Sequence, residues 1–523
     1  MASAAEHQAS LSVTFATWTG FAAMCVGMFM AILDVQVVAT SLPTIQQALS
    51  IAQEQMSWIQ TAYLIAEIIS IPLAGLFTRI LTMRWLFVLA VSTFTLASTG
   101  CAASGGFASL IVWRVIQGFS GGTLIPAVFS AVFLLFPYRR HSIATTIAGV
   151  VAVLAPTVGP VVGGWITDTF SWQWLFLINV IPGLLAALVA SFLLPQQRLD
   201  LEQARHLDVP SLALIACALA ALEIAIKEAP ERSWMSPLVA VLLAATLLAG
   251  AAFVWRTLRA PRPLVDLRLF ADRRFAVGCL LSFALGIGLY GSVYLMPVFL
   301  AYVRGHHALQ VGEIMLVTGI AQFATAPIAV ALAQRFDERR LTAAGFLLFA
   351  CGLGMSAMQT GSTDYAEMFW PQAVRGIAIM FCILPPTQLA LEHLAKSDIP
   401  DASGLFNMAR NLGGAIGIAL IDTILYSRAP IYAGRLGDQL AAGDLKAVRT
   451  LGIPPAMVDQ LLVDPNAPTI VAPLVEKQAF VEASNDAWAL VALLTVTVLI
   501  ALPLARSPLQ RAIAAVRREP RRG

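Results

Sequence analysis

The segment APTVGPVVGG, residues 155–164, decides the fold class of this chain. It lies inside a longer apolar run and combines prolines with glycines: Pro156, Pro160, Gly159, Gly163 and Gly164. Small residues let two helix backbones approach closely in lipid, where no hydrophobic force drives helices together. Proline removes helix hydrogen bonds, which is tolerated where neighbouring groups satisfy the freed carbonyls. The pattern therefore predicts a membrane-spanning helix that bends and packs tightly against a partner, with ordinary close packing as the alternative.

The composition of the whole chain agrees with a membrane location. Of the 523 residues, 58% are hydrophobic and 12% are charged, and the mean hydropathy is +0.78. These values predict an all-α polytopic membrane protein, because no soluble fold of this length is so apolar. The net charge of +3 gives no reason to expect nucleic acid as a partner. The six cysteines lie in or beside apolar runs, without the spacing of a metal site or a disulfide framework.

The apolar runs predict how often the chain crosses the membrane. A helix needs about 20 apolar residues to cross about 30 Å of hydrocarbon. By this rule the sequence predicts fourteen transmembrane helices. Their expected limits are 16–42, 54–78, 84–103, 107–136, 142–166, 172–195, 209–227, 237–256, 275–303, 311–334, 341–360, 367–391, 402–427 and 486–506.

Lysine and arginine are distributed unevenly between the two sides of these spans. If both tails are placed inside, 22 of the 33 basic residues lie on that side. Three lie in the short outer loops, five in the long outer segment 428–485 and three within spans. Short cytoplasmic loops carry an excess of lysine and arginine. We therefore expect both termini in the cytoplasm.

Two halves of the chain resemble each other. Arg114 is followed three residues later by Gln117 in the fourth span, and Gln372 is followed three residues later by Arg375 in the twelfth. The fifth and thirteenth spans repeat this offset with glycine-rich segments. Transporters built from two six-helix repeats show such echoes. The predicted organisation is a cytoplasmic tail 1–15, a six-helix bundle 16–195, an inserted helix pair 209–256, a second six-helix bundle 275–506 with an outer, periplasmic loop 428–485, and a basic cytoplasmic tail 507–523.

Several segments resemble the major facilitator superfamily, and within it the fourteen-span drug:proton antiporters. Residues 155–164 resemble the antiporter motif of the fifth helix. ILDVQVVATSLPTI (32–45) is similar to the first-helix motif, and WRVIQGFSGGTLIP (113–126) to the fourth-helix motif. LVDLRLFADRRFAVGCL (264–280) and WPQAVRGIAIMFCILPP (370–386) resemble the Emr-type inner-membrane multidrug pumps.

The resemblance implies the major facilitator fold and a proton-coupled efflux transporter of the bacterial inner membrane, with the proton gradient in place of a cofactor. Expected substrates are small amphipathic drugs or weak organic acids, exported by alternating access. Expected partners are a periplasmic adaptor (membrane fusion) protein and an outer-membrane channel. A dedicated exporter of a specific metabolite or aromatic acid, or a proton-coupled importer, is the alternative. The loop after the second helix departs from the family pattern, because Arg79 stands near the usual aspartate.

Three ionisable residues deep in the first bundle are the candidates for proton coupling. Asp34, Glu67 and Arg114 lie in the first, second and fourth spans, where charge is costly. Arginine keeps its proton, so Arg114 needs a carboxylate partner or water, and Asp34 and Glu67 are the candidates. The alternatives are structural: Asp34 as a hydrogen-bond acceptor, Glu67 as a neutral packing residue, and Arg114 in a static ion pair.

Arg375 in the twelfth span is the candidate substrate residue. A second buried guanidinium facing a cavity would favour anions through forked hydrogen bonds, whereas reaching toward headgroups is the alternative. Glu223, Glu313 and Asp422 lie near outer helix ends and are expected to contact water. Further candidates to line the cavity, chosen by helix position, are Gln36, Tyr63, Tyr290, Tyr294, Gln322 and Asn407.

The long segment 428–485 has helix-period apolar spacing interrupted by prolines, so it predicts either an amphipathic cap that contacts an adaptor or a passive lid or surface helix pair. A receptor without transport would explain the spans but not the two-fold echo. An enzyme acting on lipids would need a nucleophile and base or a metal cluster, which the loop histidines do not form. The chain is therefore not expected to be an enzyme.

Overall fold

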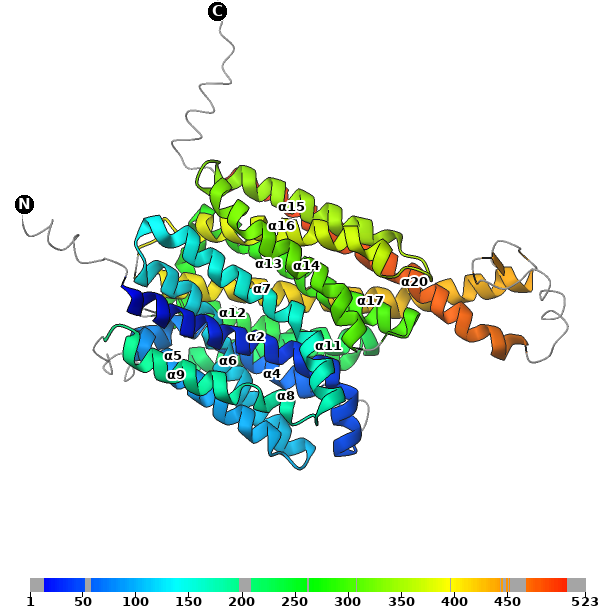
Figure 1. Ribbon diagram of the computed structural model, residues 1–523, viewed down its shortest axis with the longest axis horizontal. Coiled ribbons are helices and arrows are strands. Elements are labelled where there is room, and N and C mark those ends of the chain that lie inside the picture. Colours follow the sequence, from blue (N-terminus) through cyan, green and yellow to red (C-terminus); the bar gives the residue numbers. More distant parts are fainter. Residues whose placement is uncertain are drawn as a thin grey trace, which may run out of the picture.

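The computed structural model describes residues 14–51, 58–196, 208–260, 263–306, 308–395, 397–442, 444, 448–449, 451 and 467–505. Every regular element in these ranges is helical. Most of both predicted tails lies outside them. The main helices run nearly parallel through one elongated bundle (Figure 1). They are α2 (Phe15–Leu49), α4 (Trp58–Ser70), α5 (Ala74–Ala102), α6 (Phe107–Leu135), α7 (Tyr138–Thr169), α8 (Trp174–Leu177), α9 (Val180–Leu193), α11 (Val209–Arg232), α12 (Pro237–Arg259), α13 (Arg273–Phe299), α14 (Ala308–Ala333), α15 (Glu338–Met355), α16 (Tyr365–Leu391), α17 (Ile399–Ala441) and α20 (Ala467–Thr497).

Thirteen helices of the described chain, not the predicted fourteen, are long and apolar enough to cross a membrane. The difference lies in the second predicted span, 54–78, which is broken. Helix α4 ends at Ser70, and Pro72 lies in the turn before α5 begins. Helix α5 is itself kinked at Thr82, whose φ of 66° is in the left-handed region. The second crossing is therefore made by α4 and the first turns of α5 together.

The helices form two six-helix bundles. Helices α2, α4, α5, α6, α7 and α9 form the first bundle, and α13, α14, α15, α16, α17 and α20 the second. Glycines at corresponding positions allow close helix contact in both bundles. A Cβ on Gly118 of α6 would overlap the carbonyl oxygen of Tyr63 on α4, and a Cβ on Gly376 of α16 would overlap that of Thr318 on α14. The sequence similarity between the two halves therefore reflects the same helix packing in both bundles.

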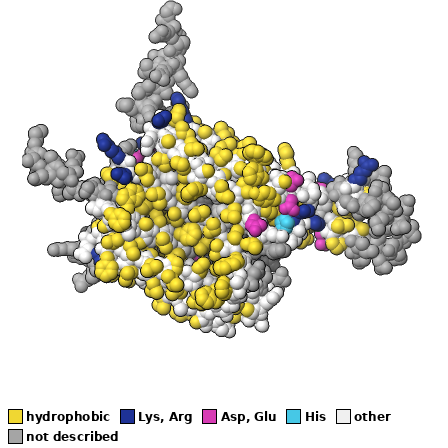
Figure 2. Space-filling model, viewed as in Figure 1, with side chains coloured by type: hydrophobic (Ala, Val, Ile, Leu, Met, Phe, Trp, Pro, Cys, Tyr) yellow, Lys and Arg dark blue, Asp and Glu magenta, His cyan; other side chains and the backbone are white. Residues whose placement is uncertain are grey.

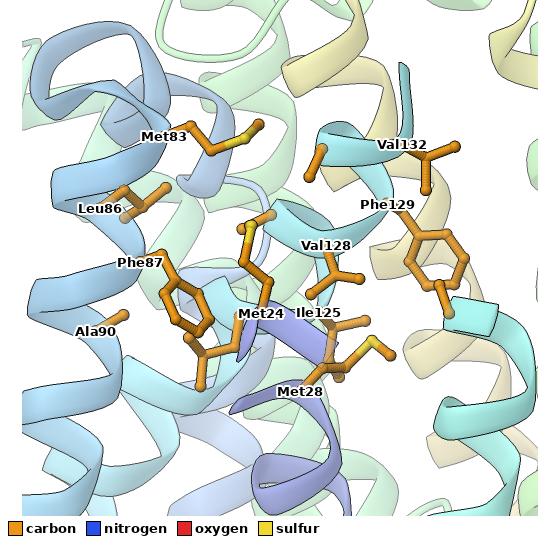
Figure 3. Packing of buried hydrophobic residues seen from close by; sticks show 14 of the residues in the cluster. Met24, Met28, Met83, Leu86, Phe87, Ala90, Ile125, Val128, Phe129 and Val132 are labelled. Carbon is orange, nitrogen blue, oxygen red and sulfur yellow. The ribbon is translucent and has the colours of Figure 1, made fainter. Parts of the chain in front are cut away.

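Methionine and aromatic side chains fill the core of the first bundle (Figure 3). Met24 and Met28 of α2 are fully buried between α5 and α6. Phe87 of α5 lies against the backbone of α2, where Gly27 leaves room for its ring. Flexible methionines fill irregular gaps between helices that cross at different angles.

The outer surface of the bundle is apolar. Figure 2 shows hydrophobic side chains over its middle and charged side chains toward its two ends. Large side chains such as Phe192, Leu247 and Ile320 are more than two-thirds exposed. A soluble protein rarely exposes so much contiguous apolar area, so this surface faces lipid. We call the end where α2 begins the terminal side, and the opposite end the loop side.

Residues 428–485, predicted as an outer loop, are helical at both described ends. Helix α17 continues to Ala441, and α20 already begins at Ala467. The two extensions project together from the loop side (Figure 1). Leu436 of α17 and Val475 and Ala479 of α20 form a small separate apolar cluster there. This cluster explains the helix-period spacing, because each extension buries one apolar stripe against the other.

Candidate functional site

Arg114 and Asp34 form a buried ion pair in the first bundle. The side chains of both are 0% exposed, and Arg114 Nη1 donates to Asp34 Oδ2. Arg114 also donates from Nη1 to Gln117 Oε1 at 2.8 Å and from Nε to the carbonyl of Ile59 at 3.0 Å. Its guanidinium carbon lies 4.4 Å from the centre of the Tyr63 ring. Arg114 therefore joins α2, α4 and α6.

Three amides and hydroxyls that the sequence did not single out as site residues complete this network. Gln117 donates to Asp34 Oδ1 at 2.9 Å and to Ser98 Oγ at 2.8 Å. Asn179 donates to the same Asp34 oxygen at 2.8 Å. Gln117 carried a signal, because it belongs to the echoed Arg114 pair. Asn179 carried none, since it lies at the break between α8 and α9 inside a continuous apolar run.

Glu67 is buried but has no such partners. Its residue is 6% exposed, and it forms no ion pair with any described side chain. The charges that act on it are Arg114, Glu223, Arg410 and Asp34. Of the two carboxylates considered for Arg114, the structure pairs Asp34 with it and leaves Glu67 separate. Ion pairing therefore distinguishes the two acids of the first bundle.

Arg375 occupies a comparable place in the second bundle but lacks a carboxylate. It is 3% exposed and donates to Gln372 Oε1 at 2.9 Å, as Arg114 does to Gln117. Its guanidinium carbon lies 5.1 Å from the ring centre of Trp488, a fully buried residue of α20 that sequence reasoning missed. Arg375 Nε and Nη1 are buried without a hydrogen-bond partner in the described chain. This guanidinium is not reaching toward headgroups.

A small cavity between the two bundles brings Arg375 and the fifth-helix motif together. Arg375 and Gln372 line it from α16, Thr318 from α14 and Ser292 from α13. Pro156, the first proline of the segment 155–164, lines it from α7. The cavity thus combines a cation that lacks a carboxylate partner and hydroxyl groups with the first proline of the α7 motif.

The glycines of the fifth-helix motif allow close packing on both sides of α7. A Cβ on Gly159 would overlap the side chain of Gln36 on α2, and Gly163 is buried. Across the seam, Gly312 and Gly319 of α14 receive Val161 and Thr157 of α7. Gly164 is buried too, and α7 passes without interruption through both prolines. The predicted tight packing is therefore present on two faces.

The remaining predicted cavity residues do not converge on one point. Tyr63 belongs to the Arg114 network, and Gln36 packs on α7. Tyr290 donates to Asn411 at 3.0 Å, and Asn407 accepts from Arg410. The others lie apart: Tyr294 donates to Asp422 at 2.6 Å, and Gln322 Nε2 lies 3.5 Å from the Met380 sulfur.

One of the three acids expected to contact water is shielded from it instead. Glu223 is 8% exposed and Asp422 is half-buried, whereas Glu313 is exposed as expected. The prediction was wrong for Glu223 because distance from the helix end was its only basis. The sequence alone does not show which neighbouring helices cover this residue. No group of three potential metal ligands occurs among the described residues.

Polar contacts join the two bundles at the terminal side. Arg79 of α5 forms an ion pair with Asp401 of α17, and Gly75 lies so close to Asp401 that a Cβ would overlap it. Ser403 of α17 donates to the carbonyl of Pro126 on α6 at 3.1 Å. We call this set of contacts the terminal latch. Arg79, which departs from the usual acidic pattern of that loop, therefore still binds a charge across the seam.

Comparisons with known proteins give the family context. The model of the Major Facilitator Superfamily matches residues 24–418. "Colistin resistance protein EmrB" of Acinetobacter baumannii is 39% identical over 409 residues, which cover 78% of this chain and 80% of that protein. "Multidrug export protein EmrB" of Escherichia coli K12 is 30% identical over 421 residues, covering 80% and 82%. "Fatty acid resistance protein FarB" of Neisseria gonorrhoeae is 27% identical over 484 residues, covering 92% and 94%.

Solved structures resemble this chain in fold. The human organic anion transporter MFSD10 (TETRAN) has a TM-score of 0.59 and 15% identity, over 92% of this chain and 99% of its own. The proton:xylose symporter XylE has a TM-score of 0.56 and 13% identity, over 91% and 94%.

Proposed function

The chain belongs to the Major Facilitator Superfamily, among Emr-type multidrug efflux pumps, and on that premise we propose that it exports amphipathic compounds in exchange for protons. The names of the relatives, multidrug export and colistin resistance, support export as the direction of transport. Two bundles that meet along a seam with a central cavity support alternating access. Exchange also requires residues that bind protons and residues that bind substrate.

Glu67, Asp34 and Arg114 are the proposed proton-coupling residues. Glu67 is buried without an ion-pair partner among the described residues, so its ionised form is costly and a proton removes that cost. Asp34 is held by Arg114, and a proton on Asp34 would weaken this pair. Arg114 has a buried Nη2 without a partner in the described chain, so its guanidinium has a donor to spare for a second acceptor. Proton binding can therefore change which helices Arg114 joins.

The unpaired guanidinium of Arg375 carries the assignment of substrate class. Two of its nitrogens are buried without partners in the described chain, and it lines the central cavity. A desolvated cation without a carboxylate favours an anionic group that accepts forked hydrogen bonds. We therefore expect weak organic acids among the substrates, beside uncharged amphipathic drugs.

The same proposal includes the membrane, the orientation and the partners. The positive-inside asymmetry supports an inner-membrane protein with its terminal side in the cytoplasm. The projecting extensions of α17 and α20 would then lie in the periplasm. There they offer a surface to an adaptor protein that leads to an outer-membrane channel. The proton gradient drives transport, and no cofactor is involved.

Transport of two matched probes tests this function. We would reconstitute the full chain in vesicles and follow 1-naphthalenesulfonate and (1-naphthyl)trimethylammonium, which share a ring and differ in charge. An acidic lumen on the loop side should drive accumulation of the sulfonate there. Arg375→Ala should lower apparent affinity for the sulfonate about tenfold to a hundredfold, as expected for lost charge-assisted hydrogen bonds, and should spare the ammonium probe. Arg375→Lys is the matched control that keeps the charge.

Three outcomes would contradict the proposal. Accumulation that does not depend on the pH gradient would contradict proton coupling. Unchanged accumulation in both Asp34→Asn and Glu67→Gln would remove these acids from the mechanism. Equal loss of both probes in Arg375→Ala would assign Arg375 a structural role. The unpaired Arg375 also fits a dedicated exporter of one aromatic or organic acid. A wider panel of acids distinguishes the two, because a dedicated exporter would transport only one of them.

A further inference from the structure

Glu223 is a buried acid that the proton-coupling scheme above does not use. It lies on α11, the first helix of the inserted pair, outside both six-helix bundles. Helix α11 packs in the seam, against α4 of the first bundle and α17 of the second. Glu223 is 8% exposed, and its Oε2 is buried without a hydrogen-bond partner in the described chain. An inserted helix therefore brings a carboxyl group into the interior of the transporter.

The position of Glu223 lies between the loop side and the middle of the membrane. One turn away, Lys227 Nζ lies 4.5 Å from the ring centre of Trp58, at the loop-side start of α4. Four residues of helix correspond to about 6 Å, so Glu223 is about that much deeper than Lys227. Glu67 is on the same helix as Trp58, nine residues further from the loop side. Helix α11 packs against α4, so Glu223 and Glu67 lie on neighbouring helices of the seam.

No cation neutralises Glu223 within the described structure. On its own helix, Lys227 pairs with Glu228. The basic residues Arg256 and Arg259 of α12 lie in the last turn of that helix, at the terminal side. Glu67 of α4 is the neighbouring acid, and the other charges near Glu67 are Arg114 and Asp34 of the first bundle and Arg410 of α17. Arg410 donates to Asn407, and Asp422 of α17 accepts from Tyr294.

Two carboxyl groups without ion-pair partners in the described chain, buried on neighbouring helices, do not ionise independently. Each charge is costly away from water, and a second negative charge nearby adds to the cost. Protonation of one member therefore eases ionisation of the other, so that the two titrations are coupled. The member of the pair nearer the loop side is the one that exchanges its proton with water on that side.

We propose that Glu223 is a second proton-binding residue, which receives protons from the loop side and passes them to Glu67. The step moves one proton from the Glu223 carboxyl to the Glu67 carboxylate, and leaves Glu223 ionised until it takes the next proton from the loop side. This inference rests on the proposed proton-driven export. It makes the inserted pair a part of the coupling machinery rather than a spacer between the bundles.

Infrared difference spectroscopy tests proton binding without any substrate. The full chain in lipid would be exchanged between acidic and alkaline buffer, and the carboxylic C=O stretch recorded. Glu223→Gln should remove one component of this band and alter the component lost in Glu67→Gln, because the titrations of the two acids are coupled. Glu313→Gln changes an exposed acid of α14 and should leave both components intact. A band unchanged by Glu223→Gln would overturn the proposal.

Transport of 1-naphthalenesulfonate tests whether this proton is used. Glu223→Gln should reduce gradient-driven accumulation at least tenfold and abolish the dependence of the rate on loop-side pH. Glu223→Asp, which keeps a carboxyl group, should restore the dependence with a shifted midpoint. A Glu223→Gln protein with the wild-type pH profile would overturn this inference alone. A wild-type protein insensitive to the gradient would overturn proton-driven export, and would remove the relay even if the infrared band showed that Glu223 binds a proton.

Discussion

The terminal latch should respond unequally to removal of its two charged partners. The side chain of Asp401 is 4% exposed, whereas that of Arg79 is 29% exposed. Arg79→Ala therefore strands a buried carboxylate, which costs about 3 kcal/mol. Asp401→Asn leaves an arginine that already reaches water, and costs about 1 kcal/mol. Both costs fall on the conformation with the latch closed, so the open fraction should rise about 150-fold and about fivefold, respectively.

A cysteine at position 403 measures this opening. Ser403 is fully buried against the carbonyl of Pro126, so maleimide reaches Ser403→Cys only when the latch opens. The six native cysteines would first be replaced, since Cys217 and Cys351 are exposed. The labelling rate should follow the open fraction in each variant. Labelling of Ser397→Cys, at an exposed position, serves as the control and should not change.

The double variant completes the test of the latch. With both charges removed, no buried carboxylate remains, so the labelling rate should fall from the Arg79→Ala value to near the Asp401→Asn value. Equal rates in the two single variants would refute the argument from burial. If the two substitutions have additive effects on the free energy of opening in the double variant, the two residues do not act as a pair.

Two further predictions concern stability. Gly118→Ala places a Cβ against the Tyr63 carbonyl and should destabilise the fold by about 2 kcal/mol. The melting temperature in detergent should therefore fall, whereas Gly105→Ala, with open space around it, should leave it unchanged. Equal melting temperatures of the two variants would exclude the close contact. Burial raises the pKa of Glu392 at the terminal side to about 7, so the folded protein binds a proton that the unfolded chain releases near pH 4. Stability should therefore fall as pH rises from about 4 to about 7. Glu392→Gln should flatten that decline in a series of thermal melts, and an unaltered slope would assign the pH dependence to other groups.

The helices and their repeat could be predicted because both depend on local sequence. Apolar length alone located nearly every crossing, and the glycines at 159 and 413–417 indicated close packing in both halves. The second crossing differed, because Pro72 and the strained Thr82 divide it into pieces too short to satisfy a rule based on length. The end of the thirteenth span was missed because α17 continues past the apolar run, supported by packing against α20.

Partners across helices were the part that sequence could not supply. Arg114 required a carboxylate, yet nothing in the chain distinguished Asp34 from Glu67 as that partner. The structure separates them because donors from Gln117 and Asn179 also converge on Asp34. The burial of Glu223 follows from which helices surround α11, and hydropathy along a chain contains no information about such neighbours.

The 43-residue helix α17 has a mechanical consequence beyond the bilayer. At 1.5 Å per residue it is about 64 Å long, about twice the thickness of the hydrocarbon. Its first turn carries Asp401, and its last turns end in the projecting pair with α20. A tilt of the second bundle that separates Asp401 from Arg79 would therefore also displace the projecting end of α17, which belongs to the same helix. Opening of the terminal latch would thus move the surface that α17 and α20 present on the loop side.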